Sequence, residues 1–257
     1  MKTTFRFSAL VFALALSARA GVTFVQSMQE IGGQKPATNN TIHLEKDRVR
    51  IDMGSNPDTY MIYRGDKKVF YTVNLKEKSY MEMTEQDFKD MAAKMDDAMK
   101  KMNESMAKMP PEQRKSMEAM MAKMMPGGAK APKITYKKVG SGGTVNGWST
   151  DKYEGSQEGA KRSEIWTTSP KSLDLNESDF QVLKDMAKFF EKFAQNMQGM
   201  VGDKSNGLDG IPVKTVSYKD GQPHFQTEVK EVKKESQPAS LFEIPAGLTQ
   251  RKMGKPQ

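Results

Sequence analysis

The chain has 257 residues, with 40 Lys and Arg, 32 Asp and Glu, two His and no Cys. Without cysteine there is no disulfide, thiolate metal site or thiol nucleophile, and His43 and His224 are too few for a multi-histidine metal site. The basic residues are mixed with acidic ones and are not gathered beside stacking aromatics, so no nucleic-acid partner is predicted.

The first twenty residues have the pattern of a secretory signal peptide. Lys2 and Arg6 precede an apolar run over 7–16, and Ala18 and Ala20 form an Ala-x-Ala cleavage site. This apolar run is too short to span the hydrocarbon core of a bilayer, which is about 30 Å thick. Its length therefore argues against an N-terminal membrane anchor. The sequence therefore predicts cleavage after Ala20 and an exported protein, residues 21–257, that is not an integral membrane protein.

Strand patterns follow, separated by short polar breaks. They cover 22–29, 41–44, 49–53, 59–63, 68–74 and 79–83. Ile42 and Leu44 share one parity, whereas Val49 and Ile51 share the other, which places a turn or bulge at 45–47. This part of the chain is predicted to be an antiparallel meander of about six strands.

A methionine-rich helical insert is predicted at 84–128. Thr84 and the acidic Asp87 have the spacing of a capping box. Methionines at 91, 95, 99, 102, 106 and 109 then recur every three or four residues, as on one face of an α-helix. Pro110-Pro111 ends this helix and starts a second one, which stops at Gly127-Gly128, so the insert is interpreted as a helical hairpin.

Further strands are expected after the insert. They cover 133–139, 145–155, 161–168, 211–219, 223–234 and 241–245, and a second long helix with a capping box at Ser178 and Gln181 covers 180–200. Gly140–Gly143 lacks the Gly-Lys-Ser/Thr ending of a phosphate loop and is interpreted as a flexible hairpin turn. The predicted fold is α+β: a single domain with one curved, mostly antiparallel sheet of about ten strands and helices on one face.

Several motifs together resemble a known family. They are 46–53 (KDRVRIDM), 69–74 (VFYTVN), 76–83 (KEKSYMEM), 145–148 (VNGW), 164–167 (EIWT) and 240–247 (SLFEIPAG). They are similar to the bacterial exported family known as domain of unknown function 4412, which is similar to the periplasmic lipoprotein-carrier superfamily. The resemblance implies an incomplete barrel whose helices close over a hydrophobic cavity, a periplasmic location, and binding of acyl chains or another apolar ligand.

The methionine stripe allows three interpretations. Thirteen of the 21 methionines lie between Met81 and Met125. They form a plain packed face, an adaptable apolar surface for a lipid or a protein partner, or a thioether site for Cu(I) or Ag(I). The second interpretation is preferred, with soft-metal sequestration and a protein-interaction module as alternatives. The predicted apolar-ligand-binding residues are Met95, Met99, Met102, Met106, Phe189, Phe190 and Phe193.

No residue pattern indicates catalysis. The carboxylates show no isolated acid–base pair, and there is no Gly-x-Ser-x-Gly nucleophile motif. The sequence therefore predicts a non-enzymatic binding protein without catalytic residues, cofactor or dedicated metal site, and with an apolar small molecule or lipid as its ligand.

Overall fold

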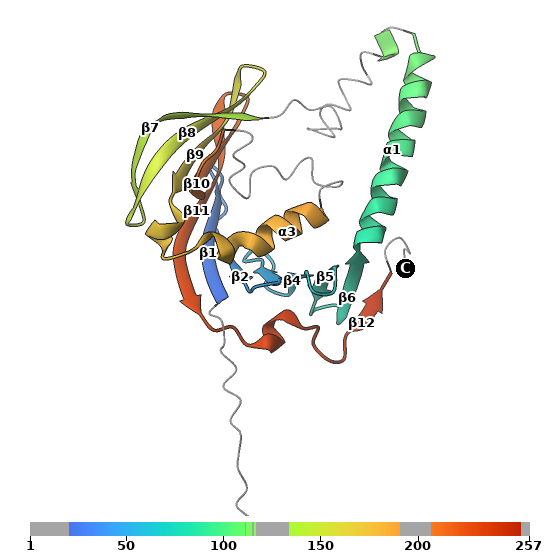
Figure 1. Cartoon of the computed structure of the whole chain (residues 1–257). Helices are drawn as coiled ribbons and strands as arrows, with labels where there is room; N and C mark the ends of the chain where they lie inside the picture. The colour runs from blue at the N-terminus through green and yellow to red at the C-terminus, as the bar shows by residue number, and fades with distance from the viewer. Residues whose placement is uncertain (1–20, 111, 115, 117–133, 191–206, 253–257) are drawn as a thin grey trace, which may run out of the picture.

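The computed structural model describes residues 21–110, 112–114, 116, 134–190 and 207–252, and these residues contain one large open sheet (Figure 1). The strands are β1 (Gly21–Glu30), β2 (Thr38–Leu44), β3 (Arg48–Asp52), β4 (Thr59–Arg64), β5 (Val69–Asn74), β6 (Ser79–Thr84), β7 (Thr135–Val145), β8 (Trp148–Gln157), β9 (Ala160–Thr168), β10 (Ile211–Lys219), β11 (Gln222–Glu235) and β12 (Thr249–Arg251).

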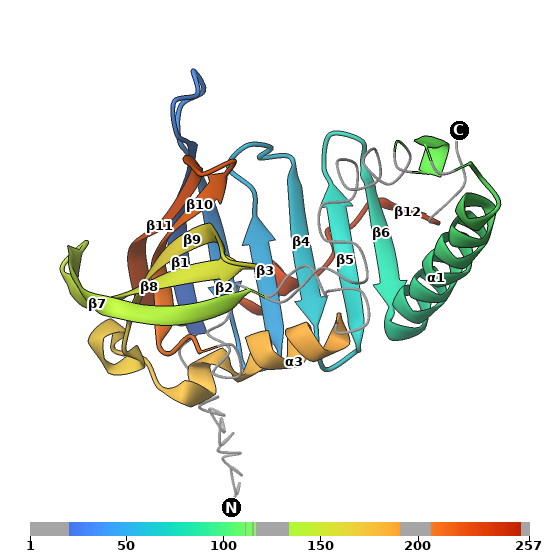
Figure 2. The ribbon, with the colours of Figure 1, turned by 90° about the horizontal axis from the view of Figure 1, so that it is seen from above.

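The sheet has the order β12-β6-β5-β4-β3-β2-β1-β11-β10-β9-β8-β7. Every pair is antiparallel except β12 with β6, which is parallel. The α+β prediction of a mostly antiparallel sheet is confirmed, but the count of about ten strands is too low, because the described residues form twelve. Figure 2 shows β7–β9 crossing the direction of β2–β6, so the sheet is strongly twisted and curved.

The helices begin close to the predicted positions. The regular helices are α1 (Glu85–Ala107) and α3 (Gln181–Phe189), and the 3₁₀ turns are η1 (Pro170–Leu173), η2 (Glu177–Phe180) and η4 (Ala239–Phe242). Thr84 caps α1 with the predicted capping box to Asp87. The second capping box is shifted by two residues, because Asp179 accepts from the backbone N–H of Asn176 at 2.9 Å.

Parts of two predicted helices fall outside the described residues. In the second helix of the insert, 112–114 and 116 are helical and 117–133 lie outside, so the hairpin stays a prediction. Arg114 nevertheless donates to the carbonyls of Met106, Ala107 and Met109, which satisfies acceptors at the end of α1. In the second long helix, residues 191–206 lie outside.

The glycine-rich segment at 140–143 is not a hairpin turn, which corrects the prediction. It lies inside β7, where register shifts at Lys138/Gly140 and Ser141/Gly143 let the strand stay paired with β8. The turn is made by Asn146-Gly147 instead, both with positive φ (46° and 90°), as a two-residue hairpin requires. Asn-Gly was therefore the stronger local signal.

The predicted turn at 45–47 is confirmed. Glu45 N–H donates to the carbonyl of Arg48 at 2.9 Å. The pairs Ile42–Ile51 and Leu44–Val49 consequently lie on the same face of the sheet. We call the face that carries α3 the inner face and the opposite face the outer face.

The main core lies on the inner face. Apolar residues of β1–β6 and β11 pack there against η1, η2 and α3, with Val22, Leu44, Val49 and Val182 at most 2% exposed. Lys234 of β11 pairs with Asp179 of η2 at 3.2 Å and so holds the start of α3 over the sheet. Trp148 and Trp166 are half-buried against this core.

A second core lies on the outer face. Tyr60, Ile62 and Val73 surround Phe242, which is 1% exposed. Phe242 belongs to residues 236–248, called here the C-terminal strap, which join β11 to β12 across β3–β6 (Figure 1). The described helices include none that is long and apolar enough to cross a membrane.

Candidate functional site

The strongest candidate for an apolar site is a cluster of rings on the inner face. It consists of Tyr63, Phe70, Phe88, Phe189 and Phe190, called here the aromatic cluster. Phe88 lies 4.9 Å from Phe190 and 5.4 Å from Phe189, and Phe70 lies 5.1 Å from Phe190, all measured between ring centroids in edge arrangements. These rings join β4, β5, α1 and α3 at one point.

The strand register and the helix start place these rings. Tyr63 pairs with Phe70 and Phe70 with Met83, so their side chains point to the same face. Phe88 comes one turn after the Thr84 cap, on the side of α1 that faces the sheet, and is 5% exposed. The end of α3 then brings Phe189 and Phe190 over them. The cluster is a packed floor between the sheet and two helices.

The predicted methionines lie along the same side of α1. Positions 88, 95, 99, 102 and 106 are spaced by three, four or seven residues, which keeps them on one helix face. Met102 is half-buried and Met106 is 8% exposed. For Met95 and Met99 the structure gives the backbone position in α1 and not the surroundings of the side chain.

The predicted ligand-binding residues do not form one compact set. Phe189 and Phe190 do come together, whereas Phe193 lies outside the described residues. Met102 is fourteen residues beyond Phe88 on α1, which is about 21 Å at the rise of an α-helix. The stripe therefore starts at the aromatic cluster and leaves it, and Figure 1 shows α1 rising from the edge of the sheet.

Sequence reasoning missed Phe88, Phe70 and Tyr63. Phe88 stands one turn before Met91 and extends the same stripe, so the helical period already contained it. The alternation of β5 and β6 likewise put Phe70 and Met83 on one face. What the sequence did not contain was the contact of these residues with the end of α3.

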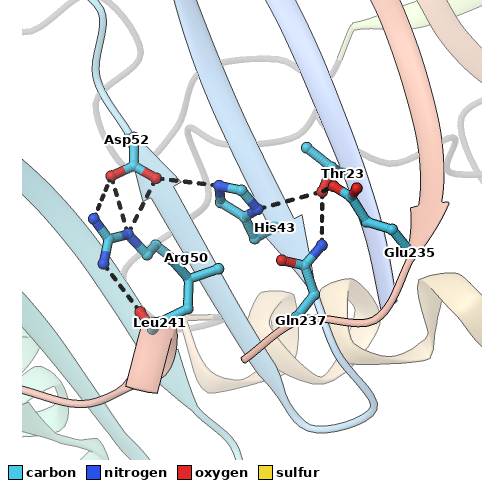
Figure 3. A network of polar contacts seen from close by, with 7 residues as sticks. All are labelled: Thr23, His43, Arg50, Asp52, Glu235, Gln237 and Leu241. Carbon is cyan, nitrogen blue, oxygen red and sulfur yellow. Dashed lines mark hydrogen bonds and ion pairs between the residues drawn. The ribbon is translucent and has the colours of Figure 1, made fainter. Parts of the chain in front are cut away.

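A polar network covers the outer face of β1–β3 (Figure 3). Its members are Thr23, His43, Arg50, Asp52, Glu235, Gln237 and Leu241. His43 lies between Thr23 Oγ1, 3.3 Å from Nδ1, and Asp52 Oδ2, 3.4 Å from Nε2. Arg50 donates to both oxygens of Asp52 and stacks on Tyr60, with Cζ 3.7 Å from the ring centroid.

The order Asp52–His43–Thr23 resembles a nucleophile with its base and orienting acid, but the proton of Thr23 goes elsewhere. The hydroxyl donates to Glu235 Oε1 at 2.9 Å and accepts from Gln237 at 2.7 Å, and Thr23 is 6% exposed. Burial acts to raise the pKa of Asp52, but hydrogen bonds from His43 and Arg50 outweigh it and hold that pKa below its usual value. The arrangement ties strands to the C-terminal strap and presents no free nucleophile.

A row of charged side chains crosses the other half of the sheet. Lys152 and Lys214 both pair with Trp166 across β8–β10 and lie 4.8 and 5.2 Å from its ring. Next to them Glu164 accepts from Lys152, Lys161 and Tyr218 at 2.8–3.0 Å. Burial acts to raise the pKa of Glu164, but these hydrogen bonds lower it to about 2.

Within the described ranges no group of three or more His, Asp and Glu is arranged to hold a metal ion. That finding concerns nitrogen and oxygen ligands. The methionine-rich insert contains four Met-x-x-Met pairs, whose thioethers would be the ligands of a soft metal. The pairs 99/102 and 106/109 lie on described residues, and 117/120 and 121/124 lie outside them.

Comparison with known proteins gives one family. The model described as domain of unknown function (DUF4412) matches residues 84–248. No curated protein matches the chain.

Three solved structures are similar at low identity. PNGF-II is 11% identical, with 91% of this chain and 31% of that chain covered and a TM-score of 0.38. The MucA/MucB complex of Pseudomonas aeruginosa is 9% identical, with 90% of this chain and 58% of that chain covered and a TM-score of 0.41. A LolA superfamily protein from Nitrosomonas europaea is 5% identical, with 88% of this chain and 90% of that chain covered and a TM-score of 0.27. The chain therefore spans less than two thirds of the first two. TM-scores of this size carry no functional assignment.

Proposed function

We propose that this chain, which belongs to the DUF4412 family, is an exported, non-enzymatic protein that binds an apolar ligand between the inner face of its sheet and its helices. The observation that carries the proposal is the aromatic cluster at the root of a methionine-rich helix. Phe88 fixes α1 to Phe70 and Phe190, and the methionine positions continue from that point along the same face of α1.

Methionine suits such a wall better than leucine. Its unbranched thioether chain adapts to differently shaped apolar partners, whereas a rigid core normally uses leucine and isoleucine. The aromatic cluster and Met83 give α1 a fixed base, since Phe88 and Met83 are 5% and 8% exposed. A fixed base with an adaptable upper stripe supports the binding of a lipid chain or a similar apolar molecule.

The binding test uses the mature chain, residues 21–257, and N-phenyl-1-naphthylamine as a fluorescent apolar probe. Met99→Glu with Met102→Glu places two charges on the stripe, and we expect the probe affinity to fall at least tenfold. Ala93→Glu with Ala107→Glu adds the same charge at exposed positions of α1 that lack the three-, four- or seven-residue spacings to the methionines, and is the matched control. Equal affinity of both double variants would contradict the proposal.

A leucine series separates the proposal from soft-metal binding. Replacing Met95, Met99, Met102 and Met106 with Leu keeps the apolar area and removes four sulfur atoms, so probe binding is expected to persist within about threefold. A Cu(I) titration of the same variant distinguishes the alternative, because thioether coordination needs the sulfur. Loss of probe binding in a folded leucine variant would show that apolar contact alone is not the basis of recognition.

A further inference from the structure

The first residue of β1 is closely enclosed by two other segments of the chain. A β carbon on Gly21 would lie 2.6 Å from the carbonyl oxygen of Leu44 and 2.7 Å from Oε1 of Glu45. It would also lie 2.7 Å from Cγ of Gln237, near the start of the C-terminal strap. Because the carbonyl of Leu44 belongs to the backbone of β2, a side chain at this position would displace that strand, and the close approach requires glycine.

The backbone nitrogen of Gly21 is therefore a near neighbour of a carboxylate. The nitrogen and the β-carbon position are both bonded to the same Cα, so the nitrogen lies no farther than about 5 Å from Oε1 of Glu45. Glu45 also accepts a hydrogen bond from the backbone N–H of Gln237. Its carboxylate thus stands between the start of β1 and the start of the strap.

Glu45 forms no ion pair with any other residue that the structure describes. Arg48 acts on it electrostatically but pairs with Asp47, with Nε 3.1 Å from Oδ1. Burial raises the pKa of Glu45, and the hydrogen bonds and the charge of Arg48 offset only part of that effect. An opposite charge within about 4–6 Å would favour the ionised carboxylate.

Cleavage after Ala20 produces such a charge. Hydrolysis of the Ala20–Gly21 bond consumes one water molecule and leaves a carboxylate on Ala20 and an ammonium group on Gly21, where the uncleaved chain has a neutral amide. We propose that Glu45 binds this new ammonium group, so that removal of the signal peptide completes an ion pair that joins β1 to the turn at 45–47 and to the strap. The inference rests on the exported, cleaved form in the proposed function and not on an apolar ligand.

Charges on each neighbouring element bear on the new ammonium group. They are His43 of β2, Glu45, Lys46 and Asp47 of the turn, Arg48 of β3, and Lys233, Lys234 and Glu235 of β11. Most of the cations have carboxylate partners of their own, since Arg48 pairs with Asp47, Lys233 with Glu231 and Lys234 with Asp179, whereas Lys46 is exposed. Glu235, opposite Gly21 in the register, adds a second negative charge and accepts from Thr23 (Figure 3).

These surroundings favour the charged form of the amino group. The ion pair should therefore raise the pKa of the Gly21 α-amino group above its ordinary range of about 7.7–8.0. A group whose pKa is raised by folding stabilises the fold fully below its ordinary pKa. That stabilisation is lost as the pH rises through the raised value.

The test follows the acetylation of the α-amino group by acetic anhydride between pH 6 and pH 10.5, because only the neutral amine reacts. The mature chain is purified after export, and its mass is checked for a start at Gly21. A free Gly-Val peptide in the same solution corrects for loss of the reagent. Cleavage after Glu30 releases 21–30, which contains no lysine, so its label reports the α-amino group alone.

We expect half-maximal labelling in the wild type to lie about one pH unit above that in Glu45→Gln, which corresponds to about tenfold slower labelling near pH 7. Asp47→Asn removes a carboxylate of the same turn that already pairs with Arg48, and as the matched control it should label like the wild type.

The wild-type protein also decides the question if Glu45→Gln does not fold. Half-maximal labelling of the folded wild type at or below about pH 7.7–8.0 would overturn the proposal. Equal midpoints in the wild type and Glu45→Gln, or a mature chain that starts at another residue, would also overturn it. The apolar probe is absent from this measurement, so a failure of probe binding leaves the result unchanged.

Discussion

The contact between the root of α1 and the end of α3 can be measured as a coupling energy. Phe88 and Phe190 are 5% and 9% exposed, with centroids 4.9 Å apart and ring planes at 86°. Phe88→Leu and Phe190→Leu keep an apolar side chain and remove the edge contact, so each should lower the free energy of unfolding by about 1 to 1.5 kcal/mol. Buried edge-to-face pairs contribute about 0.5–1.5 kcal/mol beyond the area they bury.

We therefore expect the double variant to be about 1 kcal/mol more stable than the sum of the single losses predicts. Urea unfolding followed by the fluorescence of Trp148 and Trp166 gives each free energy. The control cycle pairs Phe88→Leu with Phe242→Leu, which lies in the core of the outer face. Contributions from separated sites add to within about 0.5 kcal/mol. A coupling between Phe88 and Phe190 no larger than in the control would refute the assignment of Phe88 as the anchor of α1.

Three further predictions concern single residues. Because the pKa of Glu164 is lowered to about 2, its contribution to stability should be full above the ordinary glutamate pKa of 4.5 and be lost as the pH falls toward 2. Titration of the carboxyl followed by carbon-13 NMR checks this prediction. A midpoint near pH 4.5 would contradict it. Thr84→Ala removes the capping box and should lower the free energy of unfolding, measured in urea, by about 1 kcal/mol, whereas Thr84→Ser should stay near the wild type. An unchanged free energy of unfolding in Thr84→Ala would show that the cap does not stabilise α1. Arg64→Met removes the cation that Asp66 pairs with and leaves Glu243 only its longer pair with Lys67 at 3.8 Å. It should cost about 2 kcal/mol, below the 3–5 of fully buried pairs because both carboxylates keep solvent contact; Arg48→Met, which removes a more exposed pair with Asp47, is its control.

Local chemistry made much of the fold predictable. The Thr84 capping box, the turn at 45–47 and the alternation of β2–β6 each depend on residues near one another in the chain. In such elements the local structure is already determined by a side chain that hydrogen-bonds to a nearby backbone group, or by apolar residues at every second position. The same reasoning failed at 140–143, where two register shifts absorb the glycines within β7 and move the turn to Asn146-Gly147.

Contacts between distant segments explain what could not be predicted. The strap residue Phe242 enters the core between Tyr60 and Val73, although 241–245 was interpreted as a strand. β12 has only three residues and pairs with β6 across 170 positions of sequence, with Thr249 opposite Ser79. No local period signals such a pairing, since three residues are too few to alternate.

The same limit applies to the candidate site. Periodicity found the methionine face of α1 and the aromatic end of α3, but not that Phe88 joins them. The predicted ligand-binding residues therefore came from two separate regions, the aromatic cluster and the distant part of α1. The outer-face network around His43 had no sequence signal, because its members come from four strands and the strap.

The two faces of the sheet are covered in physically different ways, and β6 connects them. On the outer face, directed hydrogen bonds and ion pairs, as at Arg50 and Arg64, fix the strap at defined positions around the apolar contact of Phe242. On the inner face, rings and thioethers cover the sheet through non-directional apolar contact, which tolerates repacking. A ligand that displaces α1 would thus rearrange the inner covering first, and the strain would reach Thr84, where β6 becomes α1. The pairing of β12 with β6 would then resist part of that displacement, because β6 continues directly into α1.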